Sequence, residues 1–136
     1  METTTINPPE VDLVSDQAAI AQTLQFYIDG SRKGSGQVMQ SAFHPDAKLV
    51  GYVGSHLLFT PIQVLFDWID ENGPAPDIQP ELASIEVLDS IAVARLEIRE
   101  WSGKNAGSGV HMSDLFTLIK MEEGWKISQK SFHWHA

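Results

Sequence analysis

The N-terminal part of the chain carries buried-type side chains at helical spacing. From Ser15 onward the positions of one stripe recur with the period of an α-helix, and they are Ala19, Ile20, Thr23, Leu24, Tyr27 and Ile28. Ser15 or Asp16 can cap the start of this helix, and Gly30 or Gly34 can end it. The spacing therefore predicts a first helix that buries one face.

A second, short helix is predicted at residues 35–45. Its stripe consists of Val38, Met39, Ala42 and Phe43, and Pro45 closes it because the residue before a proline disfavours helical backbone. Residues 47–54 and 55–60 then indicate two short strands around Gly54.

A third helix is predicted directly after these strands. Thr60 is a favourable N-cap, Pro61 suits the first helical position, and Gln63 completes a capping box. Ile62, Leu65, Phe66 and Ile69 form its buried stripe, and Gly73–Pro74 stops it.

The C-terminal half changes to the alternation of strands. Four segments show it, at residues 81–88, 91–101, 110–121 and 125–134, with turns at 89–90 and 122–124 and a glycine-rich flexible loop at 103–109. Helices come first and strands last. This segregation predicts an α+β fold in which three N-terminal helices pack on one face of a curved antiparallel sheet.

Composition narrows the class of protein. The chain has 136 residues, of which 43% are apolar, so we expect one domain at 15–136 after a polar, mobile lead-in at 1–14. The net charge of −9 argues against nucleic-acid or membrane partners, which need a basic surface. Cysteine is absent, which excludes disulfides and thiolate chemistry. Without a secretion signal or membrane span, we expect a cytoplasmic protein.

Two motifs resemble the NTF2-like superfamily. They are "F-x-P-D-A" at 43–47 and "L-x-K-x-x-x-G-W-K-I" at 118–127, and the resemblance covers residues 17–132. Within the superfamily the chain is most similar to the group labelled putative lumazine-binding, next to the SnoaL-like proteins. The resemblance implies a cone, with a curved sheet around three helices and an apolar pocket inside. It also implies homodimers formed through the outer face of the sheet.

The ketosteroid isomerases share this architecture, and their catalytic residues match this chain only in part. Their general base, an aspartate on the first strand, falls at about Gly51, which cannot move protons. Their first-helix tyrosine falls on Tyr27, which is either a core aromatic or a hydroxyl donor inside the cone. This argues against isomerase chemistry of that kind.

Asp114 is the best candidate for acid–base chemistry. It lies inside a strong strand pattern, where a carboxylate on an apolar face needs a partner. His133 on the following strand is its predicted partner, and SnoaL-like cyclases, which the chain resembles, use an Asp and a His in this cavity. The alternative is a structural aspartate in a salt bridge.

The C-terminal "SFHWHA" raises the question of a metal site. His133 and His135 lie two apart and share a strand face. A metal needs three or four converging ligands, and neither Asp114, His111 nor His56 stands at a recognisable spacing. We therefore expect no metal and no cofactor, with one histidine near the pocket rim.

Besides a pure interaction module, two functions remain open from the sequence. The first is a small-molecule-binding protein of unassigned chemistry whose pocket is lined by Tyr27, Phe43, Phe66, Phe116 and Gln129. The alternative is an acid–base enzyme, a lyase, isomerase or polyketide-cyclase-like protein, that uses Asp114, Tyr27 and His133 as catalytic groups. Whether Asp114 faces inward separates the two.

Overall fold

The structure, a computed structural model, describes residues 13–101 and 110–135. Along the chain the elements are α1 (Leu13–Lys33), α2 (Gly36–Gln40), β1 (Phe43–Val53), β2 (His56–Pro61), α3 (Gln63–Asn72), β3 (Gln79–Leu88), β4 (Ile91–Trp101), β5 (Val110–Met121) and β6 (Gly124–Trp134). The predicted α+β class is confirmed. The predicted loop at 103–109, and the lead-in up to residue 12, lie outside the described residues.

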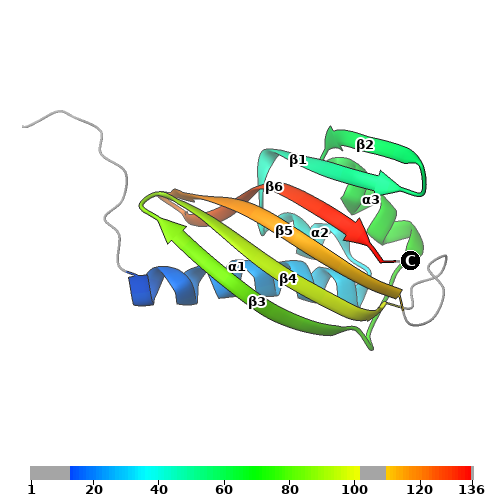
Figure 1. Ribbon diagram of the computed structural model, residues 1–136, viewed down its shortest axis with the longest axis horizontal. Helices are drawn as coiled ribbons and strands as arrows, with labels where there is room; N and C mark the ends of the chain where they lie inside the picture. The colour runs from blue at the N-terminus through cyan, green and yellow to red at the C-terminus, as the bar shows by residue number, and fades with distance from the viewer. Residues whose placement is uncertain (1–12, 102–109, 136) are drawn as a thin grey trace, which may run out of the picture.

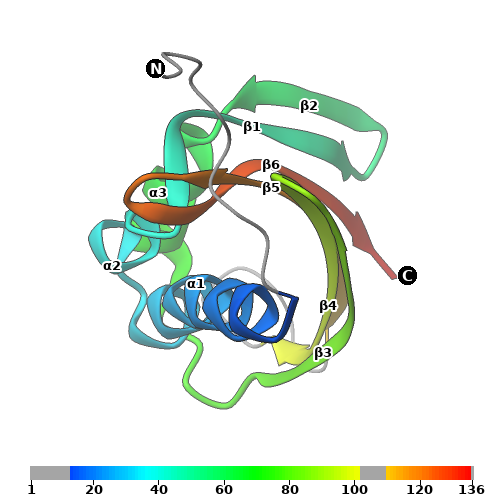
Figure 2. The same ribbon diagram turned by 90° about the vertical axis from the view of Figure 1, so that its left-hand side faces the viewer.

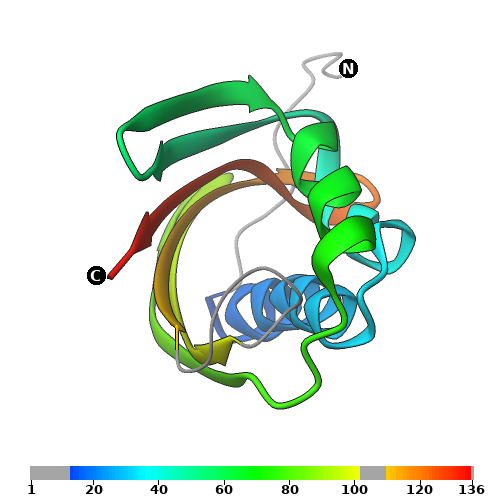
Figure 3. The ribbon, with the colours of Figure 1, turned by 90° about the vertical axis from the view of Figure 1, so that its right-hand side faces the viewer.

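All six strands form one sheet in the order β2-β1-β6-β5-β4-β3. Every neighbouring pair is antiparallel except β1 and β6, which are parallel, so the purely antiparallel sheet that we expected is wrong at this position. Figure 1 shows the long strands lying side by side over α1. Figure 2, an end view, shows the sheet curling around α1, and Figure 3 shows α3 closing the open side of the curve.

The third helix differs from the prediction in its place along the chain and in the residue at which it starts. It follows the β1–β2 hairpin, so the helices are not all N-terminal to the sheet. It starts at Gln63 behind Ile62, which makes no side-chain capping bond among the described residues. The predicted cap fails because Thr60 and Pro61 continue β2, pairing with Leu49 and Lys48.

The second helix is shorter than predicted. It ends at Gln40, and the segment from Phe43 to Pro45 already belongs to β1, where Phe43 pairs with Ile127 of β6. Pairing with a neighbouring strand therefore overrides the local helical pattern of this segment. At its start Ser35 caps the helix by accepting a hydrogen bond from Val38 N.

The core lies between α1 and the concave face of the sheet. Ile20, Leu24 and Tyr27 of α1 are at most 2% exposed, and they face Leu96, Phe116 and Ile127 from β4, β5 and β6, which are equally buried. None of the helices in the described part of the chain combines the length and apolar character that crossing a membrane requires.

Candidate functional site

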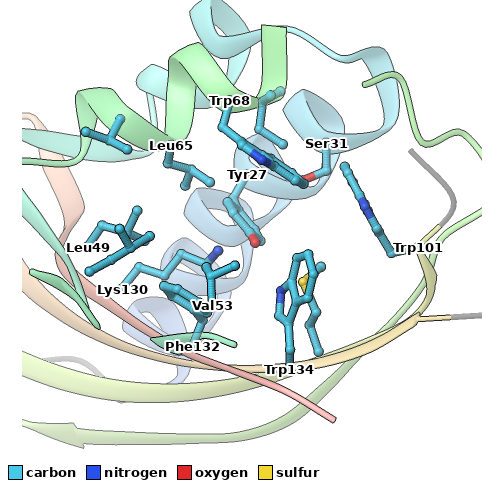
Figure 4. A pocket seen from close by; sticks show the side chains of 14 residues that line it. Tyr27, Ser31, Leu49, Val53, Leu65, Trp68, Trp101, Lys130, Phe132 and Trp134 are labelled. Carbon is cyan, nitrogen blue, oxygen red and sulfur yellow. The ribbon is translucent and has the colours of Figure 1, made fainter. Parts of the chain in front are cut away.

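A pocket opens inside the cone between α1, α3 and the sheet. Its cavity volume is about 100 Å³. This is smaller than the roughly 300–1,000 Å³ of sites for drug-sized ligands, so the pocket suits a small molecule. Its lining is mostly apolar and aromatic and consists of Tyr27, Ser31, Leu49, Val53, Leu58, Val64, Leu65, Trp68, Ile69, Trp101, Met112, Lys130, Phe132 and Trp134 (Figure 4). The lysine is its one ionic side chain among the described residues.

A bulge in β6 turns Lys130 into this pocket. Thr117 of β5 pairs with Gln129 while the next residue, Leu118, pairs with Ile127, so Ser128 is an extra residue in β6. Before the bulge, Ile127 faces the core; after it, Lys130 and Phe132 face inward. A strand of constant alternation would instead have turned Lys130 to the outside.

The bulge corrects two predicted positions. Gln129 pairs with Thr117 on the outer face of the sheet and bonds to Ser131, so it does not line the pocket. His133 pairs with Ser113 and is exposed on the same outer face, so the predicted partnership with Asp114 does not form. Both positions were predicted from unbroken alternation between residues 125 and 135.

Asp114 does face inward, and it joins Tyr27 and Lys130. The Tyr27 hydroxyl donates a hydrogen bond of 2.8 Å to Asp114 Oδ2. Lys130 Nζ lies 3.6 Å from Asp114 Oδ1, which has no hydrogen-bond partner among the described residues. Asp114 is 1% exposed and lies beneath the other two, which line the pocket. Asp114 therefore reaches a bound molecule only through Tyr27 and Lys130.

Burial governs the protonation of this group. Burial raises the pKa of Asp114 above its ordinary value, although the charge of Lys130 and the hydrogen bond from Tyr27 act in the opposite direction. Burial and the negative charge of Asp114 raise the pKa of Tyr27 well above its ordinary value of 10.0. Tyr27 is thus neutral at physiological pH, and its one proton is the one that it donates to Asp114.

The predicted phenylalanines pack behind the pocket instead of lining it. Phe116 is fully buried with its ring centroid 5.2 Å from that of Tyr27, and Phe43 packs edge-on to Tyr27 at 6.2 Å. Phe66 in turn contacts Phe43. Of the five predicted ligand-binding residues, Tyr27 is the one among the lining residues of this pocket.

The surroundings of Gly51 explain why no general base stands at this position, where the ketosteroid isomerases carry theirs. A Cβ atom at this position would lie 2.6 Å from the backbone oxygen of Phe132 and 2.7 Å from its ring. The Phe132 ring therefore fills the space that a carboxylate side chain would need.

A second polar cluster lies on the outer face of the sheet. Glu97 is 4% exposed, because the side chains around it cover it. Its Oε1 accepts a 2.6 Å hydrogen bond from Ser113 and lies 2.7 Å from His111 Nε2, and its Oε2 pairs with Arg95 at 2.6 Å. Ser113 Oγ also lies 2.7 Å from His135 Nε2.

Two ion pairs lie on this outer face, Arg95 with Glu97 and Arg99 with Glu81. The cluster also changes one prediction: the reason for expecting no metal does not hold at His135, because Glu97 and His111 bring two further metal-ligand side chains beside it.

The ionisation of Glu97 in this outer cluster differs from that of Asp114 beside the pocket. Burial alone would raise the pKa of Glu97, but hydrogen bonds from Ser113, Arg95 and His111 lower it from 4.5 to about 2. Desolvation, together with the nearby His111 and His133, lowers the pKa of His135.

Comparison with known proteins places the chain in a family. Residues 15–133 match the model of the family described as "Putative lumazine-binding", and the chain belongs to this family within the NTF2-like superfamily.

Two solved structures of related proteins share the fold over nearly their whole length. An NTF2-like protein of unknown function from Methylobacillus flagellatus is 37% identical, with a TM-score of 0.84, covering 95% of this chain and 98% of that one. One from Shewanella baltica is 31% identical, with a TM-score of 0.81 and coverage of 93% and 98%. A curated relative, "Aldolase FrzH" from Cladobotryum sp, is 26% identical over 119 residues, which are 88% of this chain and 91% of the relative.

Proposed function

We propose that the chain binds a flat, largely apolar molecule in the cone pocket through a carbonyl oxygen. The observation that carries this proposal is the pair of polar groups, Tyr27 Oη and Lys130 Nζ, that line an otherwise apolar cavity and are both held by Asp114. Because Tyr27 gives its one proton to Asp114, the Lys130 ammonium is the donor to a ligand carbonyl, and Tyr27 Oη is left to accept a hydrogen bond from an N–H or O–H group of the ligand. The family's description names lumazine, a flat bicyclic molecule with carbonyl oxygens, which fits this chemistry.

The aromatic lining supports a flat ligand. Trp68 stacks on Trp101 with ring centroids 5.5 Å apart and meets Trp134 edge-on at 6.3 Å. The indole N–H of Trp101 is buried and has no hydrogen-bond partner among the described residues. A buried donor without a partner costs free energy, so a ligand acceptor that reaches it is stabilised there.

Binding can be tested with lumazine and with a panel of apolar aromatic ketones. Because losing one hydrogen bond costs about 1 kcal/mol, Tyr27→Phe and Lys130→Met should each weaken binding about five- to tenfold. Gln129→Ala is the matched control, since Gln129 neighbours Lys130 but faces outward. Equal affinity of wild type, Tyr27→Phe and Lys130→Met for every compound that binds would contradict the proposal. So would a panel in which nothing binds.

The second candidate is lyase chemistry of the aldol type, supported by Lys130 and by the similarity to a protein named an aldolase. The uncharged amine of Lys130 would add to a substrate carbonyl carbon, and the resulting carbinolamine would take up a proton from water and expel water to leave an iminium ion. The iminium accepts the electron pair of the neighbouring C–C bond as that bond breaks, and the proton of the substrate's β-hydroxyl passes to water as the second carbonyl forms. Protonation of the resulting enamine at carbon, followed by hydrolysis of the imine, would release the product and free Lys130.

Borohydride trapping separates this candidate from binding alone. Reduction of the iminium leaves a secondary amine on Lys130, which mass spectrometry detects as a mass gain on the peptide that contains it. Lys130→Arg keeps the positive charge and the hydrogen-bond donors but cannot form an imine. A mass gain that persists in Lys130→Arg, or that never appears with any bound ketone, would leave the binding proposal standing without the chemistry.

The homodimer is also a proposal. Val93 and Leu115 project from the outer face of the sheet and are 39% and 49% exposed, which leaves apolar area for a second copy to cover. Sedimentation at micromolar concentration should show twice the mass of the 15.1 kDa chain, and a purely monomeric species would contradict it.

A further inference from the structure

The outer face of the sheet carries a cluster of ligand-type side chains that the pocket does not use. Glu97 comes from β4, His111 and Ser113 from β5, and His135 directly follows β6. Glu97 and Ser113 are paired in register, and the backbone N–H of His135 donates a 2.9 Å hydrogen bond to the carbonyl of His111. Three strands thus bring together residues that lie far apart in sequence.

The distances within this cluster suit a shared cation. One ring nitrogen from each histidine and one oxygen of Glu97 all lie within 4.8 Å of one another. In a tetrahedral zinc site with bonds of about 2.1 Å, neighbouring ligand atoms are about 3.4 Å apart. Small rotations of the two imidazoles, whose ring centroids are 4.0 Å apart, would bring the three atoms to that spacing.

We propose that Glu97, His111 and His135 bind one divalent transition-metal ion of the zinc type on the outer face of the sheet. Two imidazole nitrogens and one carboxylate oxygen are a ligand set that zinc accepts, with a fourth position left for water or for Ser113. Magnesium and calcium prefer sites made of oxygen alone, so this set disfavours them.

Several contacts hold the proposed ligands before an ion arrives. Arg95 binds Glu97 Oε2 at 2.6 Å, which orients the carboxylate and leaves Oε1 toward the histidines. Ser113 Oγ lies within 2.7 Å of both Glu97 Oε1 and His135 Nε2, so it links the two sides of the site. Such outer contacts raise metal affinity because the ligands lose little freedom on binding.

The site is accessible from solvent on one side. His135 is exposed and His111 is half-buried, whereas Glu97 is covered. An ion can therefore enter past His135 without opening the fold, and it adds positive charge next to a covered carboxylate.

The test is a calorimetric titration of tag-free protein with zinc chloride, supported by the visible spectrum of the cobalt(II) form. We expect one ion per chain and a cobalt spectrum typical of tetrahedral coordination by nitrogen and oxygen. His135→Ala should weaken binding at least tenfold, and the change does not endanger folding because His135 is exposed and lies outside the strands. Glu97→Gln should weaken it similarly while keeping the shape of the side chain.

His56→Ala is the matched control. His56 is another exposed histidine, at the start of β2 on a different hairpin, and its loss should leave zinc affinity unchanged. The proposal is overturned if wild-type protein binds no zinc. It is also overturned if His135→Ala binds zinc as tightly as His56→Ala does, because binding would then be adventitious. Neither result bears on the cone pocket, which lies on the opposite face of the sheet.

Discussion

Each face of the sheet buries a carboxylate that the sheet itself carries, Asp114 inside and Glu97 outside, and the two have opposite surroundings. Asp114 on the inner face has one hydrogen-bond donor, Tyr27, and an ammonium group 3.6 Å away. Glu97 on the outer face has Ser113, His111 and Arg95, each within 2.7 Å. The strand pairing makes them near neighbours, because Asp114 follows Ser113 and Ser113 pairs with Glu97.

The difference shows that partners, and not burial alone, decide ionisation. The pKa of Asp114 is raised because burial outweighs its few partners, whereas the pKa of Glu97 falls to about 2 because three donors outweigh burial. An inner face poor in donors keeps polar groups available for a ligand. The outer cluster satisfies its carboxylate within the protein.

The largest expected effect comes from removing the inner carboxylate. Asp114→Leu leaves the buried Lys130 ammonium without its counter-ion and the Tyr27 hydroxyl without its acceptor. The free energy of unfolding should fall by about 3–5 kcal/mol in urea denaturation. Adding Lys130→Met should restore most of this loss, because the stranded charge is then gone. A double variant as unstable as the single one would show that the ion pair is not the cause.

On the outer face the corresponding loss should be smaller. Glu97→Gln keeps the shape but replaces an anion by an amide beside Arg95, so unfolding should become easier by about 1–3 kcal/mol. Glu81→Gln is the control, because its ion pair with Arg99 is exposed and should contribute at most about 1 kcal/mol. If Glu97→Gln and Glu81→Gln lower the free energy of unfolding equally, the outer cluster contributes no more than an exposed ion pair.

The comparison also predicts opposite dependences on pH. Glu97 has a lowered pKa in the folded state, so its contribution is present above pH 4.5 and is lost as the pH falls toward about 2. Asp114 has a raised pKa, so its contribution is present below pH 3.8 and is lost as the pH rises above that value. In the wild-type protein the pH dependences contributed by Glu97 and Asp114 partly cancel.

Urea denaturation between pH 2.5 and pH 7 would separate the two contributions. Relative to wild type, Glu97→Gln should flatten the loss of stability on acidification, and Asp114→Asn should flatten the loss on raising the pH. Identical pH profiles for wild type and both variants would refute the contrast between the faces.

Most of the fold could be predicted from the pattern of apolar residues, whereas the site could not. The strand limits at 110–121 and the first helix follow from strong periodicity. The failures occur where tertiary pairing overrides local signals, as at Phe43, which joins β1 by pairing with Ile127. Likewise, Glu97, His111 and His135 meet only because three strands are aligned, and no sequence spacing encodes this.

Lys130 lines the pocket but is missing from the residues predicted from the sequence. A sequence signal for it exists: the aromatic and apolar positions Trp125 and Ile127 fall out of phase with Phe132 and Trp134. A change of phase inside one strand indicates a bulge, and the residue that then shares the inner face with Phe132 is Lys130. Reading the strand with constant alternation instead assigned the pocket to Gln129 and His133.

The smallest expected effect comes from removing the hydroxyl of Tyr27, which lies where α1 contacts the sheet. Tyr27→Phe keeps the ring packed against Phe116 but removes the one short hydrogen bond to Asp114. Water from the neighbouring pocket can replace that donor, so stability should fall by only about 1 kcal/mol. On the outer face Ser113→Ala is the matched loss of a hydroxyl, and it should cost no more, since Glu97 keeps Arg95 and His111. Ligand affinity distinguishes them: Tyr27→Phe should weaken binding in the cone, and Ser113→Ala should not. If both variants bind equally well, Tyr27 is a packing residue and the polar end of the pocket is Lys130 alone.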